Sequence, residues 1–190
     1  MYTPTRDDAL TLLKKYTKTP GLIRHALAVE AVMGHFATLF NEDVETWKII
    51  GLVHDLDYDQ FPHAHCQKCV EIFKAHDWPE AYIRAVISHG WGICSDVEPK
   101  SKMEKTLYAV DELTGLVASA ALVRPSKSIL DIKTKSVKKK FKSKAFAAGV
   151  DRNIILKGAE MLDMDLGTLI TEVIAGMKPV AEEIGLKGNL

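Results

Sequence analysis

This sequence has few cysteines, no net charge and no long apolar run, and each absence removes a class of protein. Only three cysteines occur in 190 residues, an odd number that argues against a disulfide scaffold and favours a reducing compartment. Lys+Arg and Asp+Glu both number 25, so no overall field selects nucleic acid or a membrane as partner. The most apolar run, residues 116–123, is eight residues long, whereas about 20 are needed to span a bilayer.

The N-terminal residues, MYTPTRDD, also lack the basic and then apolar pattern of a signal peptide. Together with the cysteine count, this predicts a cytoplasmic protein that does not contact membranes. Apolar residues make up 47% of the chain and charged residues 26%, which is ordinary for a globular protein. The length fits one domain, or one domain with an extension.

Helical periodicity runs through almost the whole sequence, and no segment shows the sustained alternation of a strand. Residues 20–40 show this most clearly, because their apolar residues recur every three or four positions. These apolar residues are Leu22, Ala26, Val29, Met33, Phe36 and Phe40. Further helices are predicted at residues 6–18, 43–56, 65–76, 77–90, 101–125, 151–161 and 165–183. The fold class is therefore predicted to be all-α.

Capping patterns mark three of the predicted helix starts, because each pairs an N-cap residue with an acidic residue three positions later. These pairs are Thr5 with Asp8, Asp77 with Glu80, and Ser101 with Glu104. Near the C-terminus, Pro179 is expected to bend or end the last helix.

The segment 133–144 differs from the rest, since it contains seven lysines and no acidic residue. A solvated surface is the first interpretation of such a run. A positively charged rim that attracts a phosphorylated substrate is the second. Nucleic-acid binding is the weakest, because only Phe141 is interleaved with the lysines and stacking platforms need more aromatic rings.

Four polar residues interrupt the apolar faces of three predicted helices. His25 lies on or beside the apolar stripe of 20–40, His54 and Asp55 follow the apolar run IIGLV, and Asp111 lies in the middle of 101–125. Buried carboxylates and imidazoles are costly without partners. A divalent cation would neutralise the carboxylates and accept the imidazole nitrogens. The four residues therefore predict a metal site with two nitrogen and two oxygen ligands.

Two further histidines lie at predicted helix ends, His65 at the start of 65–76 and His89 at the end of 77–90. If Asp55 bridges two ions, these histidines can complete the second one, and two ions that share a carboxylate suit attack on a phosphoryl group. His63 is a rival to His65, which is preferred for its place at a helix start.

The other histidines and the cysteines receive structural interpretations. His35 is too far along its helix from His25 to serve the same site, and His35 and His76 are assigned to packing or to the surface. Cys66 and Cys69 form a C-x-x-C pair, but with only one other cysteine a zinc or redox site is the weaker interpretation. Cys69 is expected to be a small buried residue.

An isolated histidine, a His-Asp dipeptide and a distant aspartate on a helical core resemble the pattern of the HD-domain metal-dependent phosphohydrolases. Here these are His25, His54-Asp55 and Asp111. The stretch HCQKCVEIF from His65 and the stretch AVISHG, which contains His89, resemble the two extra histidines of the dinuclear branch. The resemblance covers residues 20–123.

The resemblance implies an HD-domain helical bundle with a helical C-terminal extension. Residues 1–125 would form the metal-binding core, and residues 126–190, with the lysine-rich segment and the C-terminal helices, would pack on it. One or two divalent ions (Mn, Fe, Mg, Ni or Zn) would be cofactors. Asp55 would bridge them as the catalytic residue.

The implied reaction is hydrolysis of a phosphate ester or anhydride, such as that of a nucleotide, by a metal-bound hydroxide. The implied partner is a small phosphorylated substrate, with its phosphate near Arg124 and Lys127. One departure concerns Tyr58, which stands where many family members carry Glu or Lys. Two alternatives stay open: a di-iron oxygenase with the same ligands, and a non-catalytic module that binds a phosphorylated ligand.

Overall fold

The computed structural model describes residues 3–190 and contains, within that range, nine α-helices, two short 3₁₀-helices and no strand. The all-α prediction is confirmed. The helices are α1 (Arg6–Tyr16), α2 (Pro20–Phe40), α3 (Val44–Val53), η1 (Pro62–Ala64), α4 (Gln67–Ala75), α5 (Glu80–Ser88), α6 (Lys102–Leu122), α7 (Thr134–Phe141), α8 (Arg152–Met161), α9 (Leu166–Met177) and η2 (Lys178–Val180). In this range no helix combines the length and apolarity needed to cross a bilayer.

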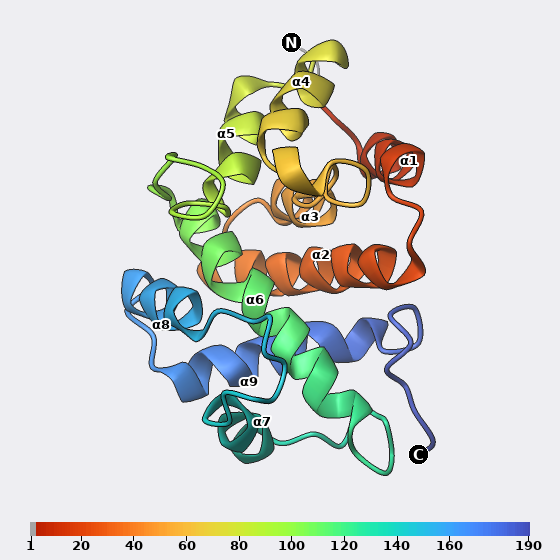
Figure 1. Cartoon of the computed structure of the whole chain (residues 1–190), viewed down its shortest axis with the longest axis vertical. Helices are drawn as coiled ribbons and strands as arrows, with labels where there is room; N and C mark the ends of the chain where they lie inside the picture. Colours follow the sequence, from red (N-terminus) through yellow and green to blue (C-terminus); the bar gives the residue numbers. More distant parts are fainter. Residues whose placement is uncertain (1–2) are drawn as a thin grey trace.

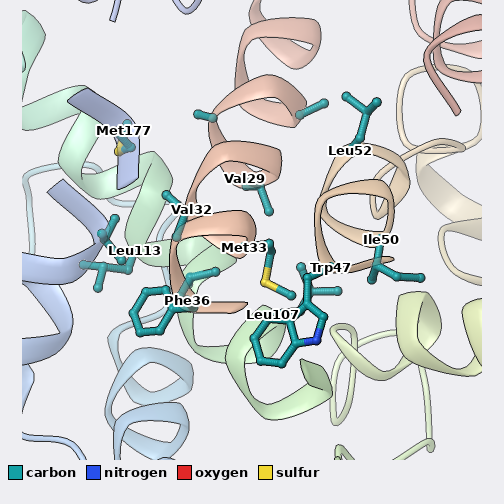
Figure 2. Close-up of a cluster of buried hydrophobic side chains, with 14 of the residues drawn as sticks. Val29, Val32, Met33, Phe36, Trp47, Ile50, Leu52, Leu107, Leu113 and Met177 are labelled. Carbon is teal, nitrogen blue, oxygen red and sulfur yellow. The ribbon is translucent and has the colours of Figure 1, made fainter. Parts of the chain in front are cut away.

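Helix α2 crosses the middle of the molecule and contacts helices on two sides. Helices α1, α3, α4 and α5 lie on one side of it, and α7, α8 and α9 lie on the other, while α6 runs past it from one side to the other (Figure 1). Met33 of α2 points toward Trp47 of α3, whereas Phe36 points to the side on which Leu113 of α6 and Met177 of α9 lie (Figure 2). All five side chains are buried. The two sides of the molecule therefore share one apolar core along α2.

Two glycines allow neighbouring helices to approach α2 closely. A Cβ added at Gly51 of α3 would lie 2.9 Å from the carbonyl oxygen of Val29 and 2.9 Å from Met33 Cγ. A Cβ added at Gly176 of α9 would lie 2.9 Å from Val32 Cα. Because glycine lacks a Cβ, both helices can rest directly on the backbone of α2.

The helix bounds agree with most of the capping patterns. Thr5 and Ser101 each form the predicted capping box. The pattern at Asp77 is wrong, because this residue has φ 55° and α5 begins later, with Pro79 as its N-cap. Helix α3 ends at Val53, three residues before the predicted end.

The C-terminal helices were predicted less well. Helix α7 lies within the lysine-rich segment and was not expected. Its only buried residue is Val137, so most of its surface is free to carry lysines. The helix predicted at residues 165–183 is shorter in the structure. Helix α9 ends at Met177, and the 3₁₀-helix η2 follows around Pro179. The division of the chain near residue 125 remains a prediction.

Candidate metal centre

Four of the predicted ligands form one cluster where α2, α3 and α6 meet. One ligand atom from each of His25, His54, Asp55 and Asp111 lies within 4.8 Å of all the others. His25 Nε2 is 2.9 Å from Asp111 Oδ1, and His54 Nε2 is 3.3 Å from the same oxygen. His54 Nε2 is also 3.4 Å from Asp55 Oδ2. The structure therefore brings together all four residues of the predicted N2O2 site.

Two adjacent residues at the end of α3 contribute to one cluster. Neighbouring side chains on a regular α-helix point about 100° apart. Helix α3 ends at Val53, so His54 is its C-cap and Asp55 lies in the turn that follows. Because His54 keeps helical backbone angles (φ −58°, ψ −38°), the two side chains still diverge, and their tips approach to 3.4 Å between His54 Nε2 and Asp55 Oδ2.

The two additional histidines meet the other oxygen of Asp55. His65 Nε2 and His89 Nε2 are each 3.4 Å from Asp55 Oδ1, and the two nitrogens are 3.2 Å apart. Asp55 Oδ2 faces His54, so the two oxygens of this carboxylate face two groups of imidazoles. His63 is exposed in η1, and no distance places it in the cluster. Asp55 is thus the carboxylate common to both groups.

Three of the imidazoles are oriented by hydrogen bonds at Nδ1. His54 Nδ1 donates to the carbonyl oxygen of Gly51 at 2.8 Å, and His89 Nδ1 donates to that of Val86 at 2.5 Å. His65 Nδ1 donates to Asp57 Oδ1 at 2.6 Å. Because Nδ1 carries the proton in each neutral ring, Nε2 presents its lone pair to the cluster. Metal-binding histidines are held in this way in many proteins.

The environment of His54 tests whether these residues fit a cation. The ring is fully buried, and its Nε2 has no hydrogen-bond partner although it faces two carboxylates. Burial lowers the pKa of His54, but the charges of Asp55 and Asp111 outweigh burial and raise it well above its usual range. Positive charge is therefore favoured at this point. A divalent cation would supply that charge and use the free lone pair, so the residues fit a metal ion.

Asp57 supports the second group of imidazoles and was not identified from the sequence. Its side chain is fully buried, with Oδ1 on His65 and Oδ2 accepting from the Cys69 amide at 2.9 Å. Asp59 has a different role, because it accepts from the backbone amides of Lys18 and Thr19 before α2. The acids at 55, 57 and 59 are visible in the sequence, but their spacing does not indicate which partner each of them has.

The cysteines are arranged differently from the C-x-x-C pattern. Cys66 Sγ lies 2.6 Å from Cys94 Sγ, while the Cys69 side chain is buried beside Asp57. Cys69 is thus the small buried residue that was expected. Cys66 also forms a group with His65 and His89 whose ligand atoms lie within 4.8 Å of one another. It is a further candidate ligand that the sequence did not single out.

A cleft of about 380 Å³ opens onto both groups of imidazoles. Besides the candidate ligands, it is lined by Leu22, Tyr58, Gly90, Ile93, Cys94, Glu112, Gly115, Gly149 and Ile154. None of these described lining residues is Lys or Arg. Burial and the charge of Asp111 raise the pKa of Glu112 to about 7. The Tyr58 ring contacts the His65 ring edge-on, with centroids 5.3 Å apart.

The structure does not bring Arg124 and Lys127 to this cleft. The Arg124 guanidinium pairs with Asp131, at 2.7 Å between Nη2 and Oδ2, and Lys127 lies in the turn after α6 with φ 50°. Neither residue lines the cleft. The expectation that they hold the substrate phosphate therefore lacks structural support, since a local acid already occupies the Arg124 side chain.

A model of the HD domain family matches residues 22–115. This span includes His25, His54, Asp55, Asp111 and the two histidines that face Asp55 Oδ1. The matched span lies within the segment 20–123 on which the resemblance was based, so the resemblance to HD domains is confirmed over these residues. HD domain proteins bind divalent metals. No solved structure matches the chain.

Proposed function

Because residues 22–115 belong to the HD domain family, which indicates the metal-dependent hydrolase superfamily, we propose that this chain is a metal-dependent phosphohydrolase. The observation that carries the proposal is the convergence of imidazole lone pairs and carboxylates on a space with no cationic side chain. The buried and unpartnered Nε2 of His54 is its clearest element. Such a space suits two divalent cations and an anionic group bound to them.

Each residue of the cluster has a defined part in this proposal. His25, His54 and Asp111 would hold one cation, His65 and His89 would hold the other, and Asp55 would contact both. Divalent ions bound here would lower the pKa of a coordinated water and offset the charge of a phosphoryl group. Three of the rings are fixed by hydrogen bonds that their Nδ1 atoms donate to protein oxygens, so little reorganisation is needed when the substrate binds.

The cleft also favours a substrate of low charge. With no Lys or Arg among the described lining residues, the bound ions alone would offset the charge of the phosphate. A single phosphoryl group on an ester suits this arrangement better than a nucleoside triphosphate does. Tyr58 and Glu112 are the oxygen-bearing side chains of the cleft apart from the aspartates, so they are the candidates for a proton donor to the leaving group.

The test combines metal analysis with a substrate panel. Protein purified without chelators is expected to contain one or two equivalents of a divalent metal. With Mn²⁺, Mg²⁺, Fe²⁺ or Ni²⁺ it should release product from p-nitrophenyl phosphate, its bis-ester or nucleoside monophosphates. Asp55→Ala should lose both metal and activity, whereas Asp59→Ala, which alters an acid outside the cluster, should keep them.

Unchanged hydrolysis in Asp55→Ala would contradict the proposal. Oxygen consumption by the iron-loaded protein without release of phosphate would replace it with the oxygenase alternative. Affinity for phosphate esters without turnover on any metal would replace it with a binding module.

A further inference from the structure

A second cavity, of about 400 Å³, lies between α2, α6 and the segment that follows α9. It shares two lining residues, His25 and Gly115, with the cleft over the His-Asp cluster. The cavity and the cleft therefore meet beside a candidate metal ligand. The lining residues are Gly21, Arg24, His25, Ala28, Thr114, Gly115, Ala118, Leu122, Met177, Ile184, Gly185 and Leu186.

The helix faces that carry two of the candidate ligands continue as walls of this cavity. On α6, Thr114 and Gly115 lie three and four residues after Asp111, and Ala118 lies seven residues after it. Residues at these spacings share one face of a helix. On α2, Gly21 and Ala28 lie four residues before and three residues after His25, and both line the cavity. A molecule bound at the cluster could extend along both faces.

The cavity walls are largely apolar and contain open space at two glycines. Met177, Ile184 and Leu186 form the wall opposite α2 and α6. A Cβ added at Gly21 or Gly115 would meet no atom within 4 Å. Neither glycine is therefore needed for close helix packing, and both face space that a ligand can fill. Arg24, on the exposed part of the wall, is the one permanently charged residue.

Thr114 provides a second and independent observation. Its side chain is 1% exposed, and its Oγ1 has no hydrogen-bond partner. A buried hydroxyl without a partner is unfavourable, and Thr114 lines the cavity. A ligand atom that accepts a hydrogen bond at this depth would satisfy it.

We propose that this cavity binds the aliphatic part of the substrate. The substrate is a phosphate monoester whose phosphoryl group lies at the His-Asp cluster and whose chain passes His25 and Gly115. An ether or hydroxyl oxygen of that chain accepts from Thr114. The assignment rests on the proposed phosphohydrolase function, and it explains why a cleft with no Lys or Arg among its described lining residues adjoins a largely apolar cavity.

The first experiment measures binding by titration calorimetry with phosphonates, whose C–P bond a phosphatase does not hydrolyse. Methyl-, propyl- and hexylphosphonate are titrated into the Mn²⁺-loaded protein and into the metal-free protein. In both, affinity should rise up to about fourfold per buried methylene, so that hexylphosphonate binds at least about tenfold more tightly than methylphosphonate. Equal affinities across the series would overturn the proposal.

The second experiment narrows the junction between the cleft and the cavity. In Gly115→Leu the new side chain enters open space, and the ratio of hexyl- to methylphosphonate affinity should fall toward one. Ser119→Leu is the matched control, because it makes a comparable change on the same helix at a residue that lines neither space. It should keep the wild-type ratio. A wild-type ratio in folded Gly115→Leu would contradict the assignment.

Thr114→Val tests the hydroxyl without changing its size. The probe pair is hexylphosphonate and 3-ethoxypropylphosphonate, which have chains of the same length. In the variant, the ratio of the affinity for 3-ethoxypropylphosphonate to the affinity for hexylphosphonate should fall by about fivefold. An unchanged preference would show that the hydroxyl does not contact the chain.

These outcomes separate the two proposals. Tighter binding of longer phosphonates, with no hydrolysis of any phosphate ester, would retain the cavity as a binding site and reject the phosphohydrolase. Hydrolysis of p-nitrophenyl phosphate, with affinity independent of chain length, would retain the enzyme and reject the cavity as a substrate site.

Discussion

The two halves of the candidate centre are built in different ways. His25, His54 and Asp111 come from the interior of α2, the end of α3 and the interior of α6. His65 and His89 come from the edges of α4 and α5, where His65 precedes Cys66 at φ 69°. The first half is thus held by packed helices and the second by turns.

This difference shows which interactions hold each half in place. Helix packing fixes the first half, because Gly51 lets α3 rest on the backbone of α2 and so sets where His54 lies. The second half relies on a few polar contacts, of which the hydrogen bond from His65 Nδ1 to Asp57 Oδ1 is the one made to a buried carboxylate. We therefore expect substitutions in the apolar core to weaken metal binding by the first half. Substitution of one carboxylate, Asp57, should weaken metal binding by the second half.

The largest effect is expected at Asp55, the residue common to both halves. Asp55→Asn keeps the shape but removes the charge that faces four histidines. Metal content should fall in both halves, and hydrolysis should fall at least about a hundredfold, because bound ions supply several kcal/mol of transition-state stabilisation. Inductively coupled plasma mass spectrometry measures the metal content, and kcat/KM measures the hydrolysis. Loss of only one of two equivalents would show that the halves are independent.

The next largest effect is expected at Asp57, where a substitution should weaken metal binding by the second half alone. Asp57→Asn weakens the anchor of His65, so affinity for one ion should fall about tenfold to a hundredfold while the other is retained. Competition with a metal indicator checks this. Asp59→Asn is the control, since it alters only the contacts before α2 and should leave both affinities unchanged. Equal weakening of both ions in Asp57→Asn would remove the distinction between the halves.

A third prediction concerns the core beneath the first half. Gly51→Ala should destabilise the fold by about 1–3 kcal/mol, because the new Cβ would overlap backbone of α2. Urea denaturation of the metal-free protein measures this. In Gly34→Ala the nearest atoms belong to the flexible Lys48 side chain, so the loss should be smaller. Equal losses would show that contact with the α2 backbone is not the cause.

The smallest effect concerns the start of α3. Hydrogen bonds from the Thr46 side chain and from the amides of Thr46 and Glu45 lower the pKa of Asp43. The stabilisation that goes with a lowered pKa is fully present above the unfolded-state pKa of about 4, and it is lost as pH falls from there through the lower pKa of the folded state. Asp43→Ala should therefore cost about 0.5–2 kcal/mol at pH 7, and the difference should shrink below pH 4. A difference that is constant with pH would show that the charge is not involved.

The sequence predicted the first half of the site better than the second. Periodicity and capping boxes are local signals, and they located α2, α6 and the ligands these helices carry. The residues between Val53 and Gln67 have no period, so the contact of Asp57 with His65 could not be found from spacing. The Cys66–Cys94 contact joins residues 28 positions apart, and no local pattern encodes it.

Charged segments account for the other differences between the predictions and the structure. Helix α7 was not predicted, because it lies in the lysine-rich segment and its single buried residue, Val137, gives it almost no apolar stripe. Arg124 was expected at the substrate because an arginine suits a phosphate. Its partner is instead Asp131, seven positions later, and a charge pair between residues in a turn has no periodic signature.

Helix α6 extends seven residues beyond the end of the HD match at residue 115, and this has a consequence for dissecting the protein. The remainder of α6 contributes Leu116 and Val117 to the core, while Gly176 of α9 rests on Val32. A fragment cut at the end of the match would leave the inner faces of α2 and α6 open to water. The segment that matches the HD domain family is therefore shorter than the part of the chain that forms the shared core.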